Sequence, residues 1–139
     1  MFRGLATISF YADDVPAAAK WYTELLAVDP YYAFPPPPAP AAYIEFRVGD
    51  DQDEFGIIDR QYAPVGAANV PGGAVAFWHV DDLAATVEQL AAMGATVYEP
   101  LTERESGFST ASFIDPFGNV LGIMANPHYL EIQARRNPS

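Results

Sequence analysis

The chain has 139 residues, half of them hydrophobic, which is enough for one compact domain with a substantial core. Cysteine is absent, which excludes disulfides, thiolate metal sites and a cysteine nucleophile. A net charge of −11 opposes binding to nucleic acids and anionic membranes but permits a cationic ligand. We find neither a secretion signal nor an apolar run of transmembrane length, so we expect a cytoplasmic location and no membrane partner.

The first half of the chain predicts a strand, a helix and three further strands. "ISFYA" has the alternation of a strand, and Asp14 is expected to cap the helix that follows. Three short strands are predicted near residues 29–34, 42–48 and 54–59. The apolar helix face that should lie on the sheet comprises Ala18, Trp21, Tyr22, Leu25 and Leu26.

Two segments of unusual composition interrupt this pattern. "FPPPPAP", residues 34–40, cannot donate to a sheet ladder, and we expect a stiff polyproline II connection at the sheet rim. A stretch rich in Gly, Pro and Ala predicts a linker over residues 61–73, which would end a first module of residues 1–60.

The second half follows the same plan. Asp82 is expected to cap a helix that ends at Gly94, and its apolar face comprises Leu83, Val87, Leu90 and Ala91. Strands are predicted near residues 95–99, 108–115 and 120–125, within a second module of residues 74–127. The tail, residues 128–139, should add one short amphipathic helix.

Two βαβββ modules predict a single α+β domain over residues 1–139, in which two curved sheets surround a cleft. Strand alternation places Ile44, Phe46 and Val48 under the helices. The opposite, cleft-facing set is Thr7, Ser9, Tyr11, Tyr43, Glu45, Arg47, Val75, Phe77 and His79.

Three motifs carry a resemblance to a known family: "ADDVPAAAKWYTELL", "VDDLAATVEQLAAMGATVYEP" and "FIDPFGNVLGIMANPH". Together they resemble the vicinal-oxygen-chelate superfamily, which includes glyoxalase I, extradiol dioxygenases, fosfomycin-resistance enzymes and bleomycin-resistance proteins. The resemblance runs from about Leu5 to His128 and is greatest to small glyoxalase-like or bleomycin-resistance-like members. It implies a homodimer, and it leaves open whether the modules pair within one chain or between chains.

The resemblance also implies where a metal would bind. Enzymes of this superfamily usually hold one divalent cation with His, Glu or Gln from the first and last strands of each half. Carried onto this chain, the four positions are Thr7, Gly56, Val75 and Gly122. None of them is a usual ligand, so we expect neither a metal nor another cofactor.

Two of these positions are glycines inside strands, where a missing side chain costs packing. Gly56 in "FGI" and Gly122 in "LGI" occupy matching places in the two halves. Two interpretations stay open. The glycines leave space at the cleft floor for a bulky ligand, or they relieve sheet curvature or a bulge.

Chemistry without a metal has few candidates. The catalytic candidates are Glu45, as a general base, and His79, as a histidine able to act near neutral pH. A Glu45–Arg47 ion pair and a His79 hydrogen bond to a neighbouring loop are the structural alternatives. His128 is expected to be a surface or packing residue. Aromatic residues that stack on a flat or cationic ligand complete the candidate ligand-binding set, which is Tyr11, Tyr43, Glu45, Arg47, Phe77, His79 and Phe108.

Three functions remain for comparison. The first is a metal-independent small-molecule binding protein that sequesters a toxic or antibiotic-like compound, with a cationic or aromatic ligand. The second is a lyase, isomerase or dioxygenase-like enzyme with an atypical site around Glu45, Arg47 and His79. The third is an interaction or regulatory module with a vestigial cleft. The sequence identifies no ligand and does not decide whether the protein is an enzyme.

Overall fold

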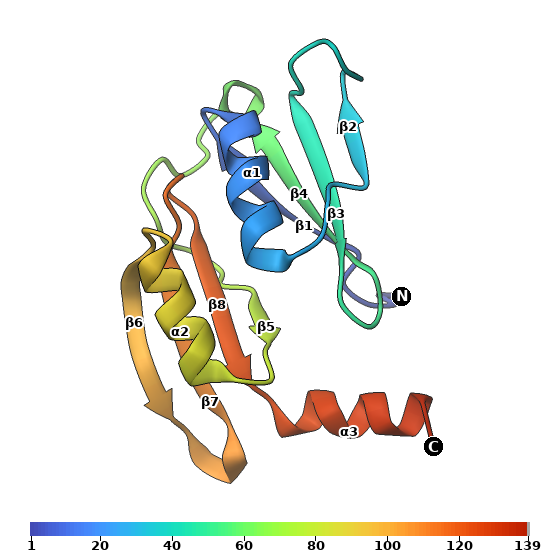
Figure 1. The fold of residues 1–139 in the computed structure, drawn as a ribbon, viewed down its shortest axis with the longest axis vertical. Coiled ribbons are helices and arrows are strands. Elements are labelled where there is room, and N and C mark those ends of the chain that lie inside the picture. The colour runs from blue at the N-terminus through green and yellow to red at the C-terminus, as the bar shows by residue number, and fades with distance from the viewer. Residues whose placement is uncertain (139) are drawn as a thin grey trace. The chain divides into compact units, whose positions relative to one another are not determined.

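The computed structural model describes residues 1–138, in which two repeats of one plan follow each other (Figure 1). The chain divides into two compact units, unit one (Met1–Asn69) and unit two (Val70–Ser139). Each unit holds a strand, a helix and three more strands, and its four strands form one sheet. The predicted α+β class and the two βαβββ modules are confirmed. The linker boundaries at residues 61–73 stay a prediction.

Unit one is a curved sheet with one helix on one face. Its strand order is β1-β4-β3-β2, with β1 parallel to β4 and the other pairs antiparallel. The elements are β1 (Thr7–Ala12), α1 (Val15–Leu26), β2 (Tyr32–Phe34), β3 (Tyr43–Val48) and β4 (Asp53–Asp59).

The core of unit one forms between α1 and this sheet. The Asp14 side chain accepts the Ala17 backbone N–H at 3.0 Å, which is the predicted N-cap. The buried Tyr22 ring packs edge-on against Phe10 and Phe55, with centroids 6.2 and 4.8 Å away. Ile44 and Phe46 are buried, as predicted from alternation, so Tyr43, Glu45 and Arg47 lie on the face turned away from α1.

Unit two repeats this arrangement with the order β5-β8-β7-β6. Asp82 caps α2 by accepting the Ala85 N–H at 3.0 Å, and Leu90 is fully buried. A C-terminal helix, α3, follows the last strand, in the segment where a helix was expected. The elements are β5 (Phe77–His79), α2 (Leu83–Ala92), β6 (Thr96–Glu103), β7 (Ser109–Ile114), β8 (Val120–Ala125) and α3 (Pro127–Arg136).

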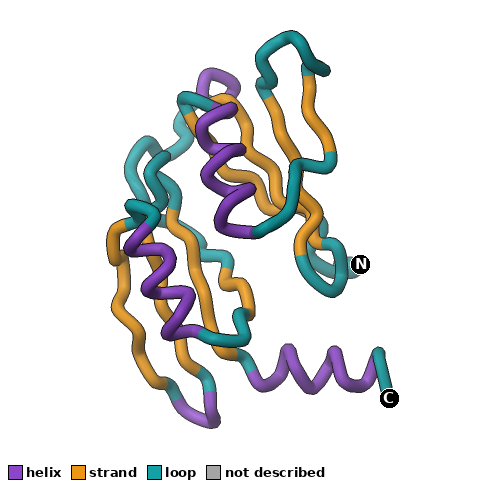
Figure 2. The backbone as a smooth tube through the Cα atoms, viewed as in Figure 1, coloured by secondary structure: helices purple, strands orange, loops and turns teal. Residues whose placement is uncertain are grey.

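The proline-rich segment differs from its prediction. It connects β2 to β3, as expected, but contains a turn at residues 37–38 instead of a continuous polyproline II stretch (Figure 2). The reason is geometric: β2 and β3 are antiparallel neighbours, so the connection must reverse direction. The Ala42 N–H donates to the Phe34 carbonyl at 2.8 Å and closes this hairpin.

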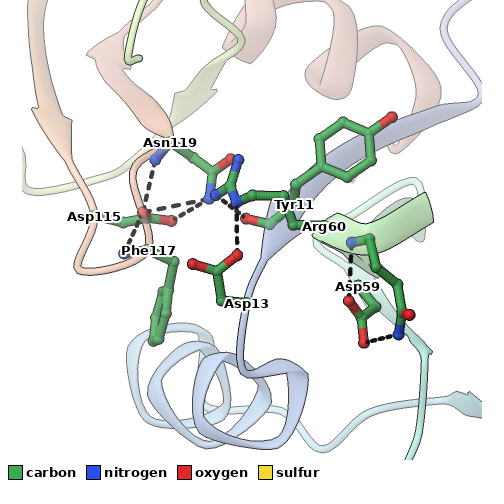
Figure 3. A network of polar contacts seen from close by, with 8 residues as sticks. Tyr11, Asp13, Asp59, Arg60, Asp115, Phe117 and Asn119 are labelled. Atoms are coloured by element: carbon green, nitrogen blue, oxygen red, sulfur yellow. Dashed lines mark hydrogen bonds and ion pairs between the residues drawn. The ribbon is translucent and has the colours of Figure 1, made fainter. Parts of the chain in front are cut away.

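Polar side chains fix the chain at the ends of two strands (Figure 3). In unit one, Arg60 donates to the Asp13 carboxylate at 3.1 Å and to the Tyr11 carbonyl at 3.3 Å. In unit two, the buried Asp115 carboxylate accepts the Phe117 and Asn119 backbone N–H groups, each at 2.9 Å, and so holds the β7–β8 turn.

No helix within residues 1–138 combines the length and the apolar character needed to span a bilayer.

Candidate functional site

The face of the first sheet that is turned away from α1 carries polar and aromatic side chains. Two carboxylates lie on it, and each accepts a hydrogen bond from a hydroxyl. Tyr43 Oη donates to Glu45 Oε1 at 2.7 Å, and Thr7 Oγ1 donates to Glu54 Oε1 at 2.6 Å. Strand register places on this face Thr7, Ser9, Tyr11, Tyr32, Tyr43, Glu45, Arg47, Glu54 and Gly56.

The Tyr43 side chain occupies the space above Gly56. A Cβ atom added at Gly56 would lie 2.7 Å from Tyr43 Cε1 and 2.8 Å from Tyr43 Oη, which is closer than real Cβ contacts. Gly56 pairs with Glu45 across the sheet, so the Tyr43 ring leans along its own strand to reach both residues. A side chain at position 56 is therefore incompatible with the observed position of the tyrosine.

Burial of Tyr43 and its hydrogen bond to Glu45 both favour the protonated form of the Tyr43 hydroxyl. Desolvation, followed by the hydrogen bond to Glu45 and the negative charge of that carboxylate, raises the pKa of Tyr43 well above its usual range. The phenol therefore stays protonated at physiological pH and remains a donor to Glu45.

Arg47 does not form the predicted ion pair with Glu45. Its guanidinium carbon lies 3.6 Å from the centroid of the Tyr31 ring, and its buried Nε has no hydrogen-bond partner among residues 1–138. The reason is that a cation–π contact with an exposed tyrosine competes with the ion pair, while Tyr43 already engages Glu45.

Unit two also has an aromatic ring over its equivalent glycine, but the ring comes from β5, whereas in unit one it comes from β3. Gly122 pairs with Phe77, and a Cβ added at Gly122 would lie 2.7 Å from Phe77 Cδ1. The same Cβ would also lie 2.7 Å from the Ala76 backbone carbonyl oxygen, which accepts the Gly122 N–H at 3.1 Å. Phe77 keeps 44 % of its surface exposed, so a ligand can reach this residue.

These contacts bear on the first of the two interpretations of the glycines. The expectation that they leave open space for a ligand is wrong, because the chain's own rings fill it. The physical reason for both glycines is close approach: an aromatic ring packs directly on the backbone of each module's last strand, and at Gly122 a neighbouring carbonyl also comes close.

His79 is held by the start of α3. Its Nδ1 accepts the Asn126 backbone N–H at 3.0 Å, and its ring stacks on Tyr129 with a 5.0 Å centroid distance and a 16° interplanar angle. Because Nδ1 is the acceptor, the proton of the neutral imidazole lies on Nε2, which is 3.5 Å from Asp81 Oδ1. The basic lone pair that a general base needs is thus already occupied by the backbone.

The remaining candidate residues lie on several elements. Glu45 and Arg47 belong to unit one, whereas His79 belongs to unit two. Tyr11 lies on β1 opposite Ile58, and Phe108 is half-buried directly before β7. Tyr32 and Glu54, which were not among the predicted site residues, share a face with Glu45.

A metal does not fit the four positions that the resemblance indicates. Thr7 donates its hydroxyl to Glu54, the two glycines have no side chain, and Val75 precedes β5 instead of lying in it. In the part of the chain that the structure describes, no three His, Cys, Asp or Glu side chains of one unit gather closely enough to hold a metal ion.

The two glycines should respond differently to alanine. Gly122→Ala should destabilise unit two by about 2 kcal/mol or more, because the new methyl group meets a backbone carbonyl that cannot move alone. Gly56→Ala should cost unit one about 1 kcal/mol, because the Tyr43 ring can turn away at the expense of its bond to Glu45. Urea unfolding measures both values.

The two tryptophans make this measurement specific for each unit, since Trp21 lies in α1 and Trp78 in β5. Trp78→Phe leaves a reporter in unit one, and Trp21→Phe leaves one in unit two. Tyr43→Ala should remove the steric part of the Gly56→Ala effect. Equal costs at both glycines, or no coupling between positions 43 and 56, would contradict the ring-on-glycine packing.

Removing the imidazole should loosen the start of α3. His79→Ala deletes the acceptor for the Asn126 N–H and the stacking partner of Tyr129, so exchange of the Asn126 amide hydrogen should accelerate by about tenfold. Hydrogen exchange followed by NMR measures this rate. His128→Ala, an exposed histidine of α3, is the matched control and should change nothing. Unchanged exchange at Asn126 in His79→Ala would show that His79 does not hold the start of α3.

Comparison with solved structures gives the same fold. Protein ATC0852 from Agrobacterium tumefaciens is similar at 24% identity, with 89% of this chain and 98% of that chain covered and a TM-score of 0.70. A member of the glyoxalase/bleomycin resistance protein/dioxygenase superfamily from Sphaerobacter thermophilus is similar at 15% identity, covering 90% and 98%, with a TM-score of 0.69. A lactoylglutathione lyase from Agrobacterium tumefaciens is similar at 19% identity, covering 88% and 93%, with a TM-score of 0.65.

No curated protein matches the sequence. A family model does match it, over residues 4–123, which span the first strand of unit one to the last strand of unit two. The chain therefore belongs to the Glyoxalase/Bleomycin resistance protein/Dioxygenase superfamily.

Proposed function

We propose that this protein binds a small organic molecule without the help of a metal ion. In this role it sequesters a toxic or antibiotic-like compound, as the bleomycin-resistance members of its superfamily do. The ligand lies on the open sheet faces, where aromatic rings and carboxylates are exposed to it. We further propose a homodimer and a cytoplasmic location, and the lack of cysteine supports this location.

One observation supports this proposal above the others. At both places where the resemblance puts a metal-binding carboxylate in the last strand of a module, the chain has glycine with an aromatic ring above it. Tyr43 and Phe77 thus offer apolar and polarizable surface in place of a charged donor. Such surfaces bind organic ligands by stacking and desolvation.

The enzyme alternative has one observation in its favour. Glu45 is a half-buried carboxylate beside a tyrosine that keeps its proton, which is an arrangement able to accept a proton from a substrate. Against it, His79 has its basic nitrogen occupied and Arg47 is turned toward Tyr31. The binding function is therefore the better supported of the two.

Metal content and metal affinity test the proposal together. The untagged protein would be assayed by mass spectrometry and then titrated with Ni²⁺, Mn²⁺, Fe²⁺ and Zn²⁺ in a calorimeter. We expect far less than one metal ion per chain and no saturable heat with micromolar affinity. Asp51→Asn is the matched control, because it removes an exposed carboxylate outside the proposed site, and cations bind such surface carboxylates weakly.

Two outcomes separate the functions. Weak metal binding that Asp51→Asn abolishes is adventitious and leaves the proposal standing. One equivalent of metal bound with micromolar affinity in both proteins would overturn it and make an enzyme the leading function, with Glu45→Gln as the first variant for activity measurements.

A further inference from the structure

We propose that unit one carries a binding site for a quaternary alkylammonium group, formed by Tyr32, Tyr43 and Glu45. This inference deepens the proposed function, and rests on it, by naming the chemical class of the ligand and the face that holds it. All three residues belong to the β2–β3 hairpin of one unit.

The two tyrosines are spaced so that one cation can contact both. Tyr32 lies directly opposite Glu45 in the strand register, on the same sheet face as Tyr43. The ring centroids are 6.3 Å apart and the rings are inclined at 56° to each other. A cation above this pair can therefore lie within about 6 Å of both centroids, the range over which cation–π attraction acts. Tyr32 keeps 48 % of its surface exposed, so a ligand can reach it.

Glu45 supplies the negative charge. Its Oε1 accepts the Tyr43 hydroxyl at 2.7 Å, which holds the ring and the carboxylate together. Among residues 1–138, no Lys, Arg or His lies within ion-pair distance of Glu45 or of Glu54. Arg47 lies on the same face. The carboxylates of Glu45 and Glu54 and the guanidinium of Arg47 together carry a net charge of −1.

Arg47 gives independent support, because this hairpin already binds a cation through an aromatic ring. Its guanidinium stacks on Tyr31 at 3.6 Å and does not pair with Glu54, the residue opposite to it on β4. The surroundings of β2 and β3 thus stabilise a weakly hydrated, planar cation on a tyrosine face even where carboxylates are near.

The same contacts favour a methylated cation over a primary amine. A primary ammonium group has three N–H donors that need acceptors when they leave water. One oxygen of Glu45 is already used by Tyr43, so few acceptors remain beside the rings. A quaternary ammonium group has no N–H donor, and the ring faces and the carboxylate charge satisfy it completely.

Tetramethylammonium is the probe that tests this site. The full chain would be titrated at constant ionic strength while tyrosine ring signals are followed by NMR, with tert-butanol as a neutral probe of similar size. We expect saturable shifts of the Tyr32 and Tyr43 signals with tetramethylammonium and at least about tenfold weaker binding of tert-butanol. Methylammonium should also bind more weakly than tetramethylammonium.

Variants assign the effect to the three residues. Tyr32→Ala and Glu45→Gln should each weaken binding by about fivefold or more. Tyr98→Ala, which removes an exposed tyrosine of unit two, is the matched control and should bind as the wild type does. Tyr32 is exposed on an edge strand, so its variant should fold, and circular dichroism would verify this for each protein.

Shifts that grow without saturation, equal binding of tert-butanol, or unaltered binding by a folded Tyr32→Ala variant would each overturn the site. This failure is distinct from failure of the proposed function. If tetramethylammonium does not bind but another organic ligand saturates the metal-free protein, the proposed function stands and only the ammonium site is rejected.

Discussion

The packing of an aromatic ring on a glycine in the last strand of each unit is the contact on which the rest of the account depends. At Gly56 the ring is Tyr43 and at Gly122 it is Phe77. Because a Cβ at either position would overlap the ring, ring and side chain exclude each other. Glycine at each of these positions therefore has two consequences. It leaves no side chain that could bind a metal, and it lets an aromatic ring lie on the backbone of the last strand.

Charge on these faces follows from the same packing. The hydroxyl of Tyr43, whose ring lies above Gly56, donates to Glu45. The carboxylate is thereby fixed beside the ring, while Arg47 is turned aside onto Tyr31. A negative group without a cationic partner then lies next to two tyrosines, which is a surface suited to an organic cation. In unit two the ring is Phe77, which has no hydroxyl, and the nearby His79 serves to hold α3.

Much of the fold could be predicted because its determinants are local. Asp14 and Asp82 cap the helices that follow them, and the alternation in β3 correctly separated Ile44 and Phe46 from Glu45. The site was harder to predict from the sequence, because a side chain can lean along its own strand and so reach residues other than the one opposite to it. The position of Tyr43 above Gly56, the bond from Asn126 to His79 and the register that brings Tyr32 opposite Glu45 all depend on tertiary geometry that periodicity does not encode.

The most direct test is a nuclear Overhauser experiment on the protein without added metal or ligand. If the rings lie on the glycines, the Tyr43 ring protons should show strong cross-peaks to the Gly56 α-protons, and the Phe77 ring protons to those of Gly122. The α-protons should also be displaced in chemical shift by the ring currents. Absent cross-peaks at both glycines, with unshifted α-protons, would mean that no ring covers Gly56 or Gly122. The exclusion of a metal-type site by aromatic packing would then be contradicted.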